Sequence, residues 1–304
     1  MLPDTRPSPA SPASDAGVIH DIGYRHYDGP RLGRAYVRRS LFLESARGGF
    51  GLGRSARSKI VPLGLLVVMS LPALVSVAIT AIVGLDSLPI GFESYVLSLQ
   101  VIVGVYVAAQ APASVSRDLR FGVLPLHFSR PMERRDYVSA KFAAMVADVA
   151  VLLAVPLTIL LAGTFLVRLP VGENLLDYAQ ALGGALLLAV LLSGIGLVIA
   201  SVTPRRGLGV AAIVTVLLVL SGVQAAVSSI LEVEGLRTAA GWAGLLSPVT
   251  LVEGVAATLL RFESDVPIGP PGAVGGAGFV LAYLLVVAAC VLALLRRYRK
   301  VSGT

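Results

Sequence analysis

The chain has 304 residues, of which 56% are hydrophobic and 14% charged, with a mean hydropathy of +0.83. Soluble domains carry about 25% charged residues, so this composition excludes an ordinary soluble domain and indicates a membrane protein. A net charge of +7 would indicate a nucleic-acid partner in a soluble protein, but here the placement of the charges has another explanation. The single cysteine, Cys290, excludes an internal disulfide and a cysteine-based metal site.

Residues 1–30 are expected to form a disordered cytoplasmic tail, because the first part is rich in Pro, Ser and Ala. In the next segment, 31–59, apolar side chains alternate with arginines. This pattern predicts an amphipathic interfacial helix over Leu32–Ala46 with its arginines reaching lipid headgroups, although a solvated linker would have a similar composition. A glycine-rich turn is expected to follow it, formed by Gly48, Gly49, Gly51 and Gly53.

This turn contains a near match to a phosphate-binding loop. Gly48 to Ser55 reads G-G-F-G-L-G-R-S, but Arg54 stands where the motif needs a lysine, and no buried strand precedes it. Both features are required for nucleotide binding. The chain is therefore expected to contain no ATPase machinery of its own and to be no enzyme.

Six apolar runs are each long enough to cross a bilayer as a helix. The second is less apolar than the others but is needed for the charge distribution described below. The runs are Ile60–Gly84, Tyr95–Ser116, Phe142–Val167, Leu175–Val202, Gly207–Leu231 and Ala273–Leu295. An all-α, polytopic membrane protein with six transmembrane helices in segment 60–304 is the expected fold.

Positive charges set the predicted orientation. Of the 25 Lys and Arg residues, 22 fall on one side of the membrane if all six runs span it, which leaves only Arg168, Arg237 and Arg261 on the other side. Lys and Arg are retained in the cytoplasm during insertion. The sequence therefore predicts a multi-pass protein of the bacterial inner membrane with both termini in the cytoplasm.

The outer segment 232–272 is too polar to span the membrane but has an apolar stretch around Trp242 and Leu246. Pro248 interrupts this stretch, and a helical pattern resumes over Glu253–Leu260. Two short helices that re-enter the membrane or lie on its outer leaflet are expected, with a plain outer loop as the alternative.

The cytoplasmic loop 116–141 reads S-R-D-L-R-F-G-V-L-P-L-H-F-S-R-P-M-E-R-R-D-Y-V-S-A-K and carries apolar residues in a charged setting. Exposed apolar groups of this kind are typical of a surface that a partner covers. The pattern resembles the loop between spans two and three of type-2 ATP-binding-cassette (ABC) exporter permeases. The matching positions are Asp118, Gly122, Leu124, Leu126, Ser129, Arg130, Pro131, Arg135, Tyr137 and Lys141.

The resemblance extends over roughly residues 31 to 300, including the interfacial helix, the six spans and the Ser247-Pro248 step. It implies that the loop forms a coupling helix docked on a cytoplasmic ABC ATPase subunit, which binds the ATP and Mg. It also implies a second permease copy, giving a homodimer unless a paralogue replaces one copy, and this dimer forms the translocation pathway of an exporter in contact with membrane lipids. No cofactor is expected in this chain, and no nucleic-acid partner.

Four polar residues inside the runs are candidates for the pathway: Gln100, Gln110, Asp148 and Gln224. An intramembrane carboxylate costs about 2.5 to 3.5 kcal/mol on insertion scales, which favours a functional or paired role. For Asp148 the alternative is an ion pair with Lys141 on the same helix, and for the glutamines it is ordinary hydrogen bonding between helices. The three histidines are scattered outside the runs, so no metal site is expected.

Two other functions remain open from the residues alone. A membrane-embedded lipid-modifying enzyme would need paired acidic or basic and acidic residues in one interfacial site, and the only such cluster, Arg117 to Asp136, lacks metal-ligand spacing. A non-transporting anchor or regulatory subunit would bind a partner without coupling ATP turnover to a solute. No pattern in the sequence identifies the transported substrate.

Overall fold

The computed structural model describes residues 28–29, 32–121, 132–203, 205–261 and 269–301. The chain consists of a short N-terminal unit, Met1–Leu32, and a unit Gly33–Thr304 that contains every helix described below. Within the described residues the secondary structure is helical throughout, with no strand. The expected all-α class is therefore confirmed, while the expected tail 1–30 lies almost wholly outside the described residues.

Among the described residues, five helices are long and apolar enough to cross a membrane. They are α2 (Ala56–Val83), α6 (Arg134–Val167), α7 (Val171–Val202), α8 (Arg206–Val233) and α11 (Gly272–Val301). Each contains most or all of one predicted apolar run. The chain thus has the helices of a multi-pass membrane protein.

Two further helix pairs are apolar enough to span but are bent. Helices α3 (Phe92–Ser98) and α4 (Gln100–Arg120) meet at Leu99 with a bend of 48°. Helix α9 (Arg237–Ala243) continues through a 3₁₀ turn (Gly244–Leu246) and is followed by α10 (Pro248–Leu260) at 116°. The described residues therefore offer five spans, or up to seven if each bent pair is one span. The expected number of six stays a prediction.

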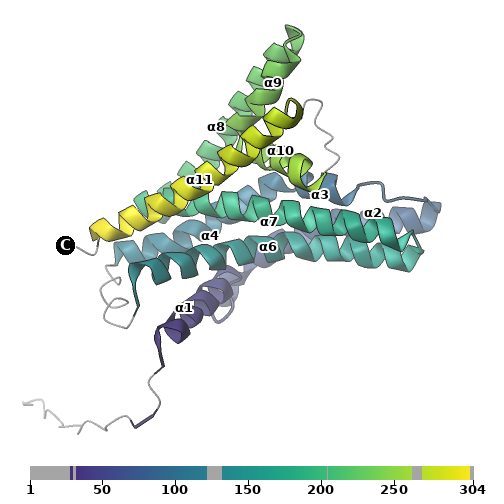
Figure 1. The fold of residues 1–304 in the computed structure, drawn as a ribbon. Coiled ribbons are helices and arrows are strands. Elements are labelled where there is room, and N and C mark those ends of the chain that lie inside the picture. Colours follow the sequence, from purple (N-terminus) through teal and green to yellow (C-terminus); the bar gives the residue numbers. More distant parts are fainter. Residues whose placement is uncertain (1–27, 30–31, 122–131, 204, 262–268, 302–304) are drawn as a thin grey trace, which may run out of the picture. The chain divides into compact units, whose positions relative to one another are not determined.

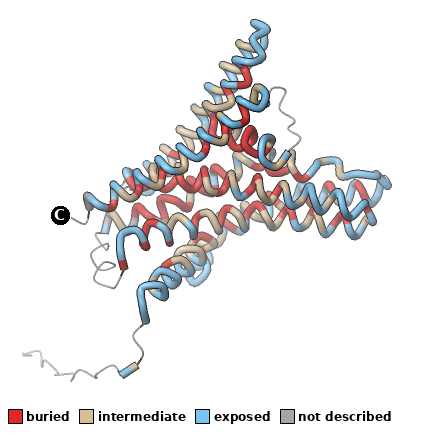
Figure 2. Tube along the Cα trace, viewed as in Figure 1, coloured by how far each residue is buried: buried red, intermediate tan, exposed pale blue. Residues whose placement is uncertain are grey.

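Helix α7 is the centre of the helical unit. It packs against α3, α4, α6, α8, α10 and α11, and buried residues are concentrated along it (Figures 1 and 2). Small side chains make this possible, because a Cβ added at Gly196 would lie 2.3 Å from Val107 Cγ1 of α4. Close approach of helices through small residues is common inside membranes.

Helix α8 has the opposite character. Its buried residues are Gly209 and Ile213, whereas Leu218, Val219 and Ile230 are more than half exposed. An apolar surface of this extent is unfavourable in water but is the normal lipid-facing surface of a membrane helix. The burial pattern thus agrees with a bilayer around α8.

One end of the bundle is the place where α4, α7 and α11 end and α2, α6 and α8 begin, and we call it the basic end. Ser116 Oγ of α4 donates to Ala200 O of α7 at 3.0 Å, and Arg297 Nε of α11 donates to Ser201 O at 3.2 Å. Those contacts place the three C-terminal ends side by side. The assignment of the basic end to the cytoplasm stays a prediction.

Helix α1 (Arg34–Gly49) precedes the spans and packs against α6. It starts two residues after the expected start at Leu32 and runs three residues beyond Ala46, so that Gly48 and Gly49 lie in the helix. The turn to α2 uses Gly51 and Gly53, whose φ angles of +67° and +78° favour glycine. At the other end of the bundle, α10 begins at Pro248 and not at Glu253, because Ser247 caps it by accepting from Val249 N.

Candidate functional site

Three residues of the loop pattern meet at the basic end. Tyr137 Oη of α6 donates a hydrogen bond of 2.6 Å to Asp118 Oδ2 of α4. Lys141 Nζ, one turn further along α6, lies 3.2 Å from the same carboxylate oxygen and donates to Ser114 O at 3.0 Å. The side chains of Asp118 and Lys141 are only 19% and 12% exposed, so this ion pair is shielded from water. Asp118, Tyr137 and Lys141 therefore form one polar cluster between α4 and α6.

This cluster continues into α11. The rings of Tyr137 and Tyr298 lie 5.1 Å apart at 55°, and both residues are almost completely buried. Since α11 and α4 are each bonded to the end of α7, the cluster joins four helices at one level of the bundle. The two flanks of segment 122–131, which are the end of α4 and the start of α6, are thus held in a fixed relation.

The other loop residues of the predicted site fall into two groups. Arg135 is exposed on the first turn of α6 and makes no hydrogen bond or ion pair with the part of the chain that the structure describes. Six residues lie outside the described residues: Gly122, Leu124, Leu126, Ser129, Arg130 and Pro131.

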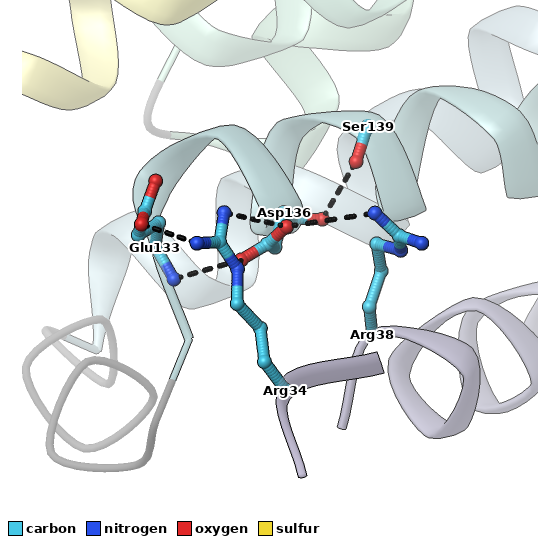
Figure 3. A network of polar contacts seen from close by, with 5 residues as sticks. All are labelled: Arg34, Arg38, Glu133, Asp136 and Ser139. Carbon is cyan, nitrogen blue, oxygen red and sulfur yellow. Dashed lines mark hydrogen bonds and ion pairs between the residues drawn. The ribbon is translucent and has the colours of Figure 1, made fainter. Parts of the chain in front are cut away.

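A second polar network fastens α1 to the start of α6 (Figure 3). Arg34 Nε donates to Asp136 Oδ2 at 2.6 Å, its Nη2 donates to Asp136 Oδ1 at 3.2 Å, and its Nη1 bonds to Glu133. Arg38 Nη1 lies 3.8 Å from Asp136 Oδ1. Asp136 also accepts from Glu133 N at 3.0 Å, which completes a capping box at the start of α6. Two arginines expected to reach lipid headgroups therefore bind a carboxylate instead.

These bonds raise the pKa of the Arg34 guanidinium above its usual value, the hydrogen bond with Asp136 being the main cause and that with Glu133 the next. The raised pKa means that this contribution to stability is complete below the ordinary arginine value and is lost only as the pH rises above it. Arg34 therefore stays charged over the ordinary pH range, and on the acid side the pair is lost as the pH falls through the pKa of Asp136, which the hydrogen bond from Arg34 lowers. Sequence reasoning did not select Glu133 and Asp136 as partners of Arg34, because a capping box usually has Ser, Thr, Asp or Asn followed three residues later by Glu or Gln, and Glu133 and Asp136 do not match it.

Asp148 lies deeper in α6 and is 3% exposed. It does not pair with Lys141, whose ammonium is bound to Asp118, so the expected alternative of an Asp148–Lys141 ion pair is wrong. Its carboxylate instead approaches the end of α1, since a Cβ added at Gly49 would lie 1.9 Å from Asp148 Oδ2. Asp148 and Gln110 both line a cavity of about 210 Å³ between α1, α4 and α6.

The other two pathway candidates lie elsewhere. Gln100 lines a small apolar pocket of about 140 Å³ between α4 and α8. Gln224 donates to Ser228 Oγ at 2.9 Å and lines a pocket of about 330 Å³ among α8, α9, α10 and α11. The four predicted pathway residues thus occupy three separate pockets of the chain. The carboxylates of Glu232 and Glu253, which sequence reasoning did not select, line the same pocket as Gln224.

A scan against models of protein families and a search of curated proteins both found no match for this chain.

Proposed function

We propose that this chain is the membrane-spanning permease subunit of a type-2 ABC exporter, working with a separate cytoplasmic ATPase. The proposal takes the basic end as the cytoplasmic end, which the excess of Lys and Arg favours. It takes segment 122–131 as the part that docks on the ATPase. The ATP and Mg are bound by that partner, and this chain contributes the pathway through the membrane.

The observation that carries the proposal is the cluster of Asp118, Tyr137 and Lys141. A docking loop transmits motion to the spans only if its two flanks are firmly attached to them. Here the buried ion pair and the Tyr137 hydrogen bond join the flanks to each other, and the Tyr137–Tyr298 contact joins them to α11. A displacement of the loop would then move α4, α6 and α11 together as a rigid body. Rigid-body rotations of domains transmit switching motions in other proteins.

Arg135 is the described residue best placed to contact the partner. It belongs to the loop pattern, it is exposed, and it lies two residues before Tyr137 on the first turn of α6. An exposed arginine next to a rigid cluster is suited to a carboxylate of an incoming protein, because its guanidinium binds carboxylates in a bidentate manner.

The proposal includes a second copy of the chain, since permeases of this class work as pairs and a two-fold axis is the usual symmetry of such a dimer. The exposed apolar faces of α2 and α8 are available to lipid and to that second copy. The outer segment 232–272, with α9 and α10 at 116° to each other, would lie at the far side of the membrane as a re-entrant segment.

The test is co-purification of the tagged, detergent-solubilised chain from its native host, followed by mass spectrometry. We expect an ABC ATPase in a near-equal amount with the native chain. Arg135→Glu should reduce the recovered ATPase about tenfold or more, since reversing a charge at a contact costs several kcal/mol. The matched control is Arg134→Glu, which changes the neighbouring exposed arginine outside the loop pattern and should retain the ATPase.

Equal loss of the ATPase with both variants would show that Arg135 acts only through net charge. Recovery of the chain alone, or with a partner that has no nucleotide-binding fold, would contradict the transporter proposal. The membrane-embedded enzyme and the non-transporting anchor would then be the functions to examine.

A further inference from the structure

Oxygen atoms that have no hydrogen-bond partner among the described residues lie in and next to the cavity between α1, α4 and α6. Ser45 Oγ of α1 and Tyr106 Oη of α4 are buried and make no hydrogen bond within the described residues. The Gln110 amide and the Asp148 carboxylate are 8% and 3% exposed, line the cavity and are likewise without a bonded partner there. A Cβ added at Gly49 would meet both Asp148 Oδ2 at 1.9 Å and Tyr106 Oη at 3.1 Å, so these two oxygens converge on the last turn of α1.

A buried carboxylate without a counter-charge is costly, so Asp148 must be neutralised by something. The charged groups that face the cavity beside it are Glu44, Arg54, Asp118 and Lys141. Lys141 and Asp118 neutralise each other at 3.2 Å. Arg54 is exposed and its guanidinium lies against Gly48, and none of these groups forms an ion pair with Asp148 in the described part of the chain.

The available donors are of one chemical kind. A carboxylate, two hydroxyls and an amide are oxygen-bearing groups that suit hard cations rather than soft metals. The last turn of α1 lies against the Asp148 carboxylate, and the C-terminal end of a helix carries a partial negative charge. Carbonyl ends of helices together with a carboxylate form alkali-ion sites in membrane transporters.

The charge count limits the ion. Among the described residues there is no group of three or more His, Cys, Asp or Glu side chains that would hold a metal ion. The lining carries three carboxylates, of Glu44, Asp118 and Asp148, and two cationic groups, of Arg54 and Lys141, so one negative charge is left for a monovalent cation to balance.

We propose that this cavity is a binding site for an alkali-metal cation, held by Asp148 with oxygen atoms of Ser45 and Gln110, next to the Tyr106 hydroxyl. The ion would neutralise the buried carboxylate and join α1 to α4 and α6. The proposal concerns a site inside one chain and does not depend on the proposed function.

The test uses the purified full-length chain in detergent and measures its thermal unfolding midpoint in NaCl, KCl or choline chloride at constant ionic strength. We expect a saturable rise of the midpoint with Na⁺ or K⁺ over choline, because an ion that binds only the folded state stabilises it by mass action. Asp148→Asn should abolish this rise. The matched control is Asp86→Asn, which removes an exposed carboxylate and should keep it.

A direct binding measurement with radioactive ²²Na⁺ covers the case in which Asp148→Asn fails to fold. Gly49→Ala, which would place a Cβ against Asp148 Oδ2, should lower the amount bound, whereas Gly64→Ala, with open space around its Cβ, should not. Absence of saturable alkali-ion binding, or equal binding by Asp148→Asn, overturns the proposal. Stabilisation by acid in choline alone, with no response to alkali ions, also overturns it and shows that Asp148 holds a proton.

Discussion

The two ends of the helical bundle are held together by different chemistry. At the basic end, charged and hydroxyl groups of α1, α4, α6, α7 and α11 bond to one another, as in the Arg34–Asp136 and Lys141–Asp118 pairs. Towards the opposite end, neutral hydroxyls join helices, as Ser221 does with Ser247 at 3.3 Å, Tyr283 with Leu187 O at 3.0 Å, and Tyr95 with Met69 O, and close packing adds to these bonds. Hydrogen bonds and ion pairs are directional and hold neighbouring helices in register, whereas packing depends on how well side chains fill the space between helices.

Glycines against aromatic rings dominate that opposite end. A Cβ added at Gly254 of α10 would lie 2.2 Å from Phe279 Cδ1 of α11, and one added at Gly278 would lie 2.8 Å from the Trp242 ring. The rings of Trp242 and Phe279 are themselves 6.4 Å apart. The absence of side chains at these glycines lets α9, α10 and α11 approach each other. The comparison implies that the two ends respond to different perturbations.

The largest effect is expected from adding a side chain at a close helix contact of the end opposite the basic end. Gly254→Leu should destabilise the chain by about 3 kcal/mol, because overpacking of a tight contact costs roughly 1 to 3 kcal/mol and the ring of Phe279 must move. Gly222→Leu on α8 is the matched control, since the space around its Cβ is open and leucine favours a helix more than glycine. Equilibrium unfolding in mixed micelles with SDS measures both, and equal effects would refute the packing explanation.

A somewhat smaller effect is expected from removing a polar contact at the basic end. Asp136→Ala removes the partner of Arg34 and the acceptor of Glu133 N, with an expected loss of about 2 kcal/mol after allowance for the half-exposed arginine. Glu173→Ala is the control, because Glu173 is also an acidic residue in the first turn of a span but is exposed. The same unfolding assay applies. An unchanged stability of Asp136→Ala would mean that α1 is held by its apolar contacts alone.

The smallest expected effect is a difference between the two ends in how their stability responds to salt. Raising the salt concentration should weaken the exposed Arg34–Glu133 pair slightly, since surface ion pairs contribute little to stability and are screened by salt. The loss caused by Arg34→Gln should therefore shrink at high salt, while that of Gly254→Leu should not change. If the loss of stability caused by Arg34→Gln does not depend on salt, packing and not charge stabilises this contact.

Composition and apolar runs were sufficient to predict the long helices, because their length and hydrophobicity are local properties of the chain. The helix bounds differ where polar groups decide them. Helix α6 begins at Arg134, well before the run that starts at Phe142, since the Glu133–Asp136 capping box extends the helix beyond its apolar part. The bend at Leu99 could not be predicted in this way, because no glycine or proline stands at or next to this position.

The candidate site was predicted in part for a similar reason. The loop pattern selected Asp118, Tyr137 and Lys141, which the fold brings together. The expected Asp148–Lys141 pair failed because seven residues of helix separate these Cα atoms by about 10 Å, and Asp118 on another helix is closer to the lysine. The partners of Arg34 and of Asp148 lie on segments remote in sequence, and periodicity alone does not identify such contacts.

The attachment of α1 to α6 has a consequence for the order of events during synthesis. Arg34 and Asp136 are 102 residues apart, and α2, α3 and α4 are made between them. At about 5 to 20 residues per second, the ribosome adds the carboxylate roughly 5 to 20 s after the arginine. Arg34 of α1 therefore has no Asp136 to bind until α6 has been made, and the docking of α1 marks the completion of the first half of the bundle.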